Sequence, residues 1–357
     1  MITFESLFKD ETKLGTKIKT DDYLEHGKHP IVDQGQCKVA GYTNLEDGIY
    51  TDVPAVIFGD HTRVIKYIDE PFFLGADGTK ILKGCEPHSN QKYLYYALRA
   101  AKIPNLGYSR HFKCLKELKF VEHSEDEQWR IVFELDKLSK IISLKTKELF
   151  LYDNLIKARF VEMFEGKNMD KETIGNIASF CSRGKSPKYV PESRLKVVNQ
   201  ACIYWDRFKF ENVKYNEETY DGDRILLNND LLICSTGTGT LGRCNIFHAP
   251  DNSRYMADSH VTIIRLNNHI LPEVFKIWFE RPSTQEKLYS DCVSGSTNQI
   301  ELSKEKLKNI SILVPPIGLQ KQFATFVAQV YKSKFAVQKS LEKTQLLFDS
   351  LMQEYFG

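Results

Sequence analysis

The sequence predicts an α+β protein in which two mixed α/β domains are separated by two long antiparallel helices, as a pseudo-two-fold tandem repeat. Its 357 residues are too many for one ordinary domain and suit two. Two long segments carry apolar residues at steps of three, four and seven, which is typical of amphipathic helices. These segments match each other at a constant offset of 192 residues, as Phe164 and Phe356 do.

The composition is that of a soluble globular chain. Hydrophobic residues make up 42% and charged residues 27%, and no apolar run approaches the eighteen or more residues of a membrane-spanning helix. Disordered, collagen-like and membrane-spanning proteins are therefore excluded. The 49 basic and 47 acidic residues leave a net charge of +2, so any contact with nucleic acid must come from local clustering.

The N-terminal segment and the cysteines both favour a cytoplasmic protein. Residues 1–11 carry acidic side chains early and lack the basic start and apolar core of a signal peptide. None of the 8 cysteines forms a CxxC pair, so in a reducing compartment they are most simply buried small hydrophobes. We expect the protein to stay in the cytoplasm.

The first domain is expected over residues 1–122 and the first helical segment over 123–167. Residues 55–58 form a short apolar run before a glycine, which predicts a buried strand, and residues 91–101 predict a short helix. The long helix itself is expected from about residue 127 to residue 164, where glycine and asparagine follow and end it.

The second half repeats this order, with a domain over 168–316 and a helical segment over 317–357. Residues 231–234 predict a buried strand and 272–280 a short helix. A double proline then precedes a long helix expected over about 319–356. The offset between the halves drifts in the globular parts and is constant in the helices, a pattern produced by loops that vary on a fixed scaffold.

Two helices of this length have a geometric consequence. One amphipathic helix cannot bury its apolar stripe alone, so the two should pack together. Antiparallel packing would place the globular parts at opposite ends of a rod, which suits reading two half-sites one or two turns of duplex apart, at ~34 Å per turn. The alternative is that the helices only dimerise the protein.

Several motifs, in this order and duplicated with the helices, resemble the DNA-specificity subunit of type I restriction-modification systems. The likeness covers nearly the whole chain, although the first junction, 122–128, lacks the double proline of the second. The residues that carry it are Gly59-Asp60-His61-Thr62-Arg63, Pro71-Phe72-Phe73-Leu74-Gly75-Ala76-Asp77-Gly78, Arg183-Gly184-Lys185-Ser186-Pro187, Ser235-Thr236-Gly237-Thr238-Gly239-Thr240-Leu241-Gly242, Ala257-Asp258-Ser259-His260 and Leu313-Val314-Pro315-Pro316 with Gln320.

The resemblance implies that each domain is a target-recognition domain that reads one half of a bipartite site in double-stranded DNA. It also implies that the helices set the spacing between half-sites and dock two methyltransferase (M) subunits. Restriction and translocation (R) subunits would join that core. On this reading the chain is a non-catalytic subunit without a cofactor of its own.

The residues themselves also argue against a methyltransferase or a nucleotide-binding protein. The only Pro-Pro pair, Pro315-Pro316, lacks the acidic or amide residue before it and the aromatic after it that adenine methylation needs, and no FxGxG is present. Gly184-Lys185-Ser186 looks like the end of a phosphate-binding loop, but Ser179 stands where that loop needs its first glycine.

Candidate DNA contacts in the first domain are four residues of two loops. Arg63 is the best base reader among them, because a guanidinium can bridge O6 and N7 of guanine. Any one of the four is otherwise a phosphate contact or a surface residue. They are His61, Thr62, Arg63 and Arg110.

Candidate contacts in the second domain fall into three groups. A basic group suits the DNA backbone, a glycine- and threonine-rich turn suits close approach to phosphates, and an amide pair suits adenine. A solvated loop and a plain tight turn are the alternatives. The three groups are Arg183, Lys185 and Lys188; Thr236, Thr238 and Arg243; and Asn298 with Gln299.

Two other functions stay open from the residues alone. Asp60-His61 allows a free-standing metal-dependent nuclease, although neither residue has a third ligand at a recognisable spacing. The second is a recognition module of another phage-defence assembly, which would keep the DNA contacts and change the partner enzyme.

Overall fold

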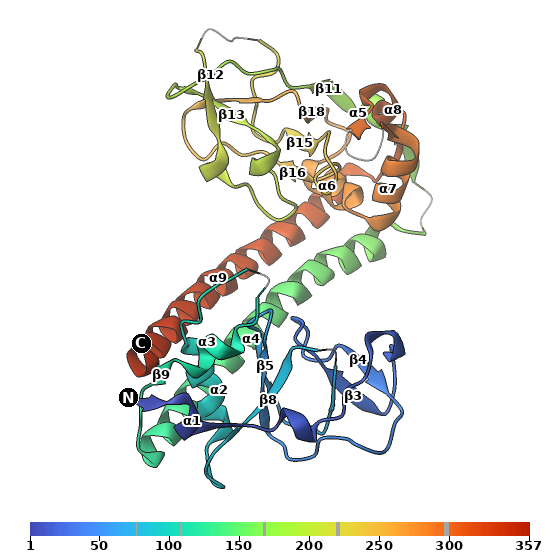
Figure 1. The fold of residues 1–357 in the computed structure, drawn as a ribbon. Coiled ribbons are helices and arrows are strands. Elements are labelled where there is room, and N and C mark those ends of the chain that lie inside the picture. Colours follow the sequence, from blue (N-terminus) through green and yellow to red (C-terminus); the bar gives the residue numbers. More distant parts are fainter. Residues whose placement is uncertain (76, 108, 167–168, 219–221, 296–299) are drawn as a thin grey trace. The chain divides into compact units, whose positions relative to one another are not determined.

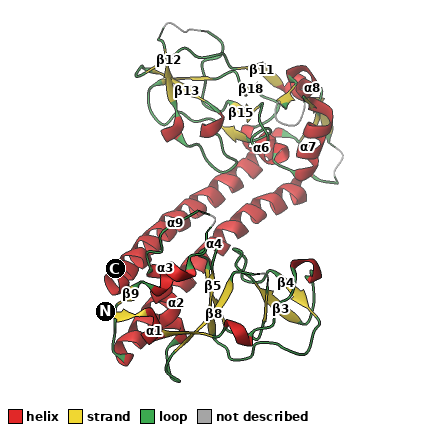
Figure 2. Ribbon diagram, in the orientation of Figure 1, coloured by secondary structure: helices red, strands yellow, loops and turns green. Residues whose placement is uncertain are grey.

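The computed structural model describes residues 1–75, 77–107, 109–166, 169–218, 222–295 and 300–357. The chain divides into two compact units: unit 1 is Met1–Glu148 with Val337–Gly357, and unit 2 is Leu149–Ala336. Both mix helices with short strands, as Figures 1 and 2 show, so the predicted α+β class is confirmed. Within the described residues, no helix is long and apolar enough to cross a membrane.

Unit 1 holds a four-stranded antiparallel sheet, a three-stranded sheet and a two-stranded pair. The strand orders are β2-β8-β5-β6, β4-β3-β7 and β1-β9. The elements are β1 (Ile2–Thr3), α1 (Phe4–Leu7), β2 (Phe8–Asp10), β3 (His29–Val32), β4 (Gly41–Thr43), β5 (Ala55–Gly59), β6 (Ile65–Ile68), β7 (Phe73–Leu74), β8 (Thr79–Gly84), α2 (Gln91–Ala100), α3 (Phe112–Lys116) and β9 (Lys119–Phe120).

Unit 2 has two four-stranded sheets and two strand pairs. The strand orders are β11-β18-β15-β16, β12-β14-β13-β17, β10-β21 and β19-β20. The elements are β10 (Asp170–Thr173), α5 (Ile174–Ile177), β11 (Ala178–Arg183), β12 (Tyr189–Val190), β13 (Leu195–Val198), β14 (Lys214–Asn216), β15 (Leu231–Cys234), β16 (Cys244–Ile246), β17 (Arg254–Ala257), β18 (Val261–Leu266), α6 (Pro272–Phe279), α7 (Pro282–Lys287), β19 (Val293–Ser294), β20 (Glu301–Leu302), α8 (Lys304–Lys308) and β21 (Ser311–Val314).

The two units are built on one topology, so the predicted repeat extends from the helices into the sheets. The order β2-β8-β5-β6 in unit 1 corresponds to β11-β18-β15-β16 in unit 2. In each unit the second sheet contains a parallel pair, β3 with β7 and β13 with β17. The predicted strands at 55–58 and 231–234 are the fully buried strands β5 and β15, which occupy equivalent places.

The two long helices begin and end at equivalent residues. Helix α4 spans Glu125–Phe164 and α9 spans Ile317–Phe356, so each has 40 residues and both ends differ by 192. Each helix begins two residues earlier than predicted. For α4 the reason is Ser124, whose hydroxyl and backbone N–H both bond to the Glu127 carboxylate in a capping box.

Two equivalent glutamines, one in each long helix, anchor the starts of the helices. Gln128 donates its side-chain amide to the His123 carbonyl, and Gln320 donates to the Pro315 carbonyl, in each case five residues back. Gln320 is fully buried and also accepts a hydrogen bond from the Leu271 N–H. The first junction therefore makes the same contact without the double proline.

In each unit the two helices bury their apolar stripes against each other. In unit 1 Leu135, near the start of α4, shares a core with Phe348, near the end of α9. In unit 2 Phe160 and Phe164, at the end of α4, pack their rings 5.6 and 5.3 Å from that of Phe323. The start of one helix thus meets the end of the other, which confirms the predicted antiparallel pair.

The predicted domain boundaries and the compact units differ in how they treat the helices. The boundaries at 122, 167 and 316 set each helix apart as a spacer, whereas the compact units divide α4 after Glu148 and α9 after Ala336. Each unit core in fact contains residues of both helices. The four-segment division stays a prediction.

Phe323→Ala should destabilise unit 2 by about 3–5 kcal/mol, because it removes a fully buried ring and leaves a cavity against Phe160 and Phe164. Phe335→Ala, on the same helix but 71% exposed, should change the unfolding free energy by less than ~0.5 kcal/mol. Urea denaturation followed by circular dichroism measures both. Equal effects would contradict the helix packing described above.

Candidate nucleic-acid interface

In unit 1, three loops that are far apart in the sequence meet at one edge of the sheets. They are the segment after β3, the loop between β5 and β6, and the turn between β7 and β8. Gln34 joins all three: its Oε1 accepts from the His61 N–H at 3.1 Å, and its Nε2 donates to the Asp77 carbonyl at 3.0 Å. The Thr62 hydroxyl adds a bond to the Gln34 carbonyl at 2.6 Å.

Charged side chains border this loop cluster. Lys17 Nζ lies 2.6 Å from Asp77 Oδ1, and this hydrogen bond and charge lower the pKa of the Asp77 carboxyl below its usual value. The nearby charge of Arg110 lowers that pKa further, so the predicted contact Arg110 lies close to the β7–β8 turn. Arg110 is exposed, as a group that meets a phosphate or a base must be.

The guanidinium of Arg63 is less accessible than that of a residue expected to read a base. It takes the left-handed backbone conformation, with φ of 59°, at the end of the β5–β6 loop. Its guanidinium donates to the Ile103 carbonyl at 3.3 Å and is half-buried. To read a base, this side chain must first release that bond, whereas Thr62 beside it is exposed.

Asp60 is buried and holds the start of α3. Its carboxylate accepts from the Phe112 N–H at 2.7 Å, and its carbonyl accepts from the His111 N–H at 2.8 Å. Asp60 therefore fastens the β5–β6 loop to the segment that carries Arg110. Over the described ranges, no group of three or more His, Cys, Asp or Glu residues could hold a metal ion.

Unit 2 contains an equivalent loop cluster, joined by Gln200. Gln200 Nε2 donates to the carbonyl and hydroxyl of Thr236, at 2.9 and 2.6 Å, and to the His260 carbonyl at 3.3 Å. Thr236 belongs to the β15–β16 loop and His260 to the β17–β18 turn. These are the counterparts of the loops that Gln34 joins in unit 1.

The glycine- and threonine-rich loop between β15 and β16 is a tight turn with an exposed tip. Gly237 and Gly239 have φ of 87° and 83°, which disfavour other residues. Of the predicted contacts, the Thr236 hydroxyl already accepts from Gln200, while Thr238 is exposed at the tip. Arg243 donates to the Gly239 carbonyl at 2.9 Å.

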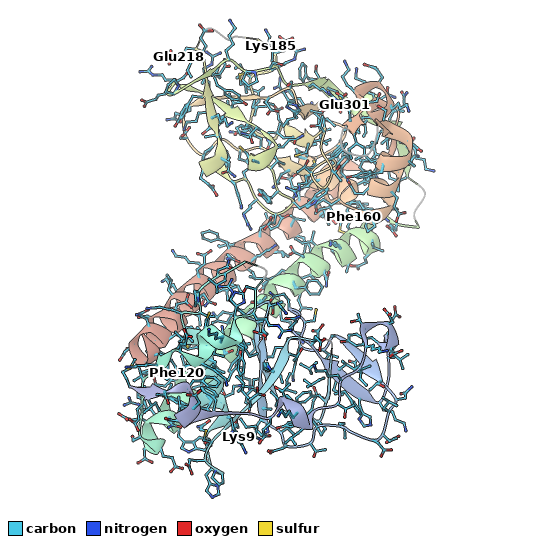
Figure 3. The ribbon with its side chains drawn as sticks, viewed as in Figure 1. Lys9, Phe120, Phe160, Lys185, Glu218 and Glu301 are labelled. Atoms are coloured by element: carbon cyan, nitrogen blue, oxygen red, sulfur yellow. The ribbon has the colours of Figure 1, made fainter. Side chains whose placement is uncertain are left out.

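The basic group after β11 splits into an engaged arginine and two exposed lysines. The Arg183 guanidinium pairs with Glu301 and donates to the Leu302 carbonyl at 2.8 Å, and burial lowers its pKa. Lys185 and Lys188 are exposed, and Lys188 Nζ lies 3.5 Å from a Glu217 oxygen. Figure 3 shows Lys185 on the outer loops of unit 2.

Gly184 explains why the loop before Lys185 needs glycine. A Cβ at this position would lie 2.2 Å from the carbonyl oxygens of Ala257 and Asp258. Its N–H donates to the Val261 carbonyl at 2.8 Å, so the loop lies against the β17–β18 turn. The glycine serves close backbone packing here. The predicted amide pair, Asn298 and Gln299, lies outside the described residues.

The matched Ala-Asp motifs have opposite electrostatic settings. The Asp77 carboxyl is exposed and paired with Lys17, whereas Asp258 is buried and accepts from the His260 N–H. Burial raises the pKa of Asp258 above its usual value. The charge presented at this position therefore differs between the units.

Sequence reasoning missed Gln34, Gln200 and Lys17. A signal for the glutamines is present, because Val32-Asp33-Gln34 and Val198-Asn199-Gln200 repeat at an offset of 166, each just after a strand. Their partners lie 27 and 43 residues away for Gln34, and 36 and 60 for Gln200. Only the folded sheets bring these residues together.

Comparison with known proteins supplies the family. The family model of the type I restriction modification DNA specificity domain matches residues 166–346, just over half of the chain. The chain belongs to this family. It is also 26% identical over 204 residues to the specificity subunit of a type I restriction enzyme of Escherichia coli. That alignment covers 53% of this chain and 49% of the relative, so the chain spans about half of that protein's length.

Solved structures of the same kind share the fold. The type I restriction-modification S subunit of M. genitalium superimposes with a TM-score of 0.64 at 17% identity, over 99% of this chain and 95% of that one. A chain from a structure of type I restriction-modification complex assembly gives a TM-score of 0.53 at 14% identity, over 99% and 95%. The predicted fold and family are thus confirmed for this specificity-domain protein.

Gln34→Ala should weaken recognition of one half-site only, and Gln200→Ala of the other. Each change removes the side chain that holds two loops in register, and loss of one or two hydrogen bonds corresponds to roughly tenfold in affinity. Competition binding with duplexes altered in one half-site measures this. Gln353→Ala, an exposed residue of α9 outside the loop cluster, is the control and should behave as wild type.

Both glutamine variants should keep the wild-type unfolding midpoint to within a few degrees. A uniform loss of affinity for every duplex, or loss at both half-sites from one substitution, would contradict a positioning role confined to one unit.

Proposed function

We propose that this chain gives a type I restriction-modification complex its DNA specificity, with each unit reading one half of a bipartite site. The observation that carries this proposal is the loop cluster built twice, once around Gln34 and once around Gln200. A rigid sheet edge that presents exposed loops is a suitable base for side chains that enter a groove of DNA.

The exposed predicted residues are the first candidates for contact with the duplex. Thr62 and Arg110 in unit 1, and Thr238, Lys185 and Lys188 in unit 2, present their side chains to solvent. Arginine and lysine neutralise phosphates, so the affinity should fall steeply with salt. Arg63 and Arg183 already donate to carbonyl groups, and we assign them to DNA contact only after those bonds rearrange.

The helix pair is proposed to set the spacing and to dock two methyltransferase subunits, to which the restriction subunits join. The face of a paired helix that points away from its partner is normally polar. Here large apolar side chains remain exposed. On α4, four of them form two pairs at i, i+4 spacing, and the members of each pair share a face. They are Trp129 (58% exposed) and Phe133 (60%) in unit 1, and Leu151 (52%) and Leu155 (47%) in unit 2.

Methylation profiling of the host genome tests the proposed function. With the gene intact, one split motif of two short half-sites around an unspecified spacer should carry methylated adenine, and deletion of the gene should remove it. The methyltransferase must be expressed in both strains, which immunoblotting verifies. A motif that survives the deletion would contradict the proposal, and unaided cleavage of DNA by the purified chain would favour the nuclease alternative.

Shortening the helix pair should change the spacer and leave the half-sites intact. Removing residues 140–146 from α4 together with 340–346 from α9 deletes Lys145 and its hydrogen-bond partner Ser340 together, so neither loses its partner. Seven residues correspond to ~10 Å of helix, or roughly three base pairs at 3.4 Å each. Methylation profiling reads out the new spacer, and an altered half-site sequence would contradict the assigned role of the helices.

A further inference from the structure

Unit 2 contains an aromatic and basic loop that unit 1 lacks. Residues 33–40 join β3 to β4, whereas the longer segment 199–213 joins the equivalent strands β13 and β14. Both segments begin with the glutamine motif described above. The additional residues in unit 2 include Tyr204-Trp205-Asp206-Arg207-Phe208-Lys209.

Three cations surround the ring of Tyr204. Lys209 Nζ lies 4.5 Å from the ring centroid, Arg243 Cζ lies 5.1 Å away and Arg207 Cζ lies 5.7 Å away. Each distance is within the range of a cation–π contact. We call Tyr204, Arg207, Lys209 and Arg243 together the Tyr204 platform.

The positive charge of the platform is only partly neutralised. Asp206 pairs with Arg207 at 2.8 Å, but across the described part of the chain no carboxylate forms an ion pair with Lys209 or Arg243. The three cations lie about one Debye length or less from one another, ~10 Å at 0.1 M salt, so they repel. A bound anion would relieve this repulsion.

The loop that carries the platform is held rigidly from beneath. Asn245 Nδ2 donates to the Tyr204 carbonyl at 2.9 Å, and the Lys209 N–H donates to the Cys202 carbonyl at 2.8 Å. On its inner side Phe208 stacks on Phe210 at 5.5 Å and meets Phe247 edge-on at 6.0 Å. The backbone that carries the cations is thus fixed before any ligand binds, which reduces the entropy lost on binding.

The platform adjoins the loop proposed to meet DNA. Arg243 lies in both, because its guanidinium contacts the Tyr204 ring and donates to the Gly239 carbonyl in the glycine- and threonine-rich loop. Arg207 is 58% exposed at the side chain, so the platform faces solvent. An anion on the platform would therefore lie beside the exposed tip at Thr238.

We infer that the Tyr204 platform is a phosphate-binding site for the DNA backbone, present in unit 2 and absent from its counterpart in unit 1. This inference rests on the proposed function, since the duplex must lie on the β15–β16 loop. The two half-sites are then held unequally. The half read by unit 2 has the steeper dependence on salt, because more phosphates are neutralised there.

The double variant Arg207→Gln/Lys209→Gln tests the site in the full chain purified with its methyltransferase subunits. Affinity for a duplex with the split motif is measured over a series of KCl concentrations. Each lost phosphate contact should reduce the slope of log K against log salt by about 0.9, so the double variant should flatten it by up to ~1.8. The preferred half-site sequences should not change.

The control is Lys171→Gln/Lys287→Gln, which removes the same charge from two exposed positions of unit 2 and should leave the slope near that of wild type. A wild-type slope in the Arg207/Lys209 variant would overturn the phosphate site while the split motif still stands. Loss of the methyltransferase subunits on purification would also overturn it, in favour of an acidic protein partner. Failure of the wild-type complex to prefer its split motif would contradict the proposed function as well.

Discussion

The burial of two apolar helix stripes against each other is the constraint on which the rest of this protein depends. A helix of 40 residues presents more apolar surface than it can cover alone, and propensity gives it little stability in water. Each unit therefore builds its core partly from α4 and partly from α9, with Leu135 and Phe348 in one and Phe160, Phe164 and Phe323 in the other. Neither globular part is a self-contained sequence segment.

The loops of the two units are also organised by a repeated contact. Each unit uses one glutamine, placed just after a strand, to hold a loop and a turn that come from distant parts of the sequence. Base recognition requires side chains held within a fraction of an ångström, while the loops themselves must vary to read different sequences. A repeated backbone anchor below variable tips satisfies both requirements.

The two units differ most where they would contact DNA. The Ala-Asp turn carries an exposed, paired carboxylate in unit 1 and a buried one in unit 2. The loop after β13 adds the ring of Tyr204 with the cations of Arg207 and Lys209 against it, an arrangement that has no counterpart in residues 33–40 after β3. Because the sheets beneath are alike, these differences would give the two units different sequence preferences under the proposed function.

The helices, the strands β5 and β15, and the repeat could be predicted from the amino-acid pattern, because all three depend on local periodicity. Helical spacing of apolar residues needs no knowledge of the partner, and the offset of 192 holds at both ends of both helices. Ser124 moved the helix start by two residues, through a capping box that a search for apolar spacing alone overlooks. The candidate contacts could be proposed from the sequence as Arg, Lys and Thr in predicted loops, and their role in binding stays a prediction.

Which of those residues are available to a ligand depends on contacts between distant parts of the chain. Arg183 is engaged by Glu301, more than a hundred positions away, and Arg63 by the carbonyl of Ile103. The roles of Gln34 and Gln200 could be identified only in the folded structure, where the sheets bring their hydrogen-bond partners within 3.3 Å. Hydrogen bonds and ion pairs between distant segments produce no periodic pattern in the sequence, because each depends on how the fold brings two loops together.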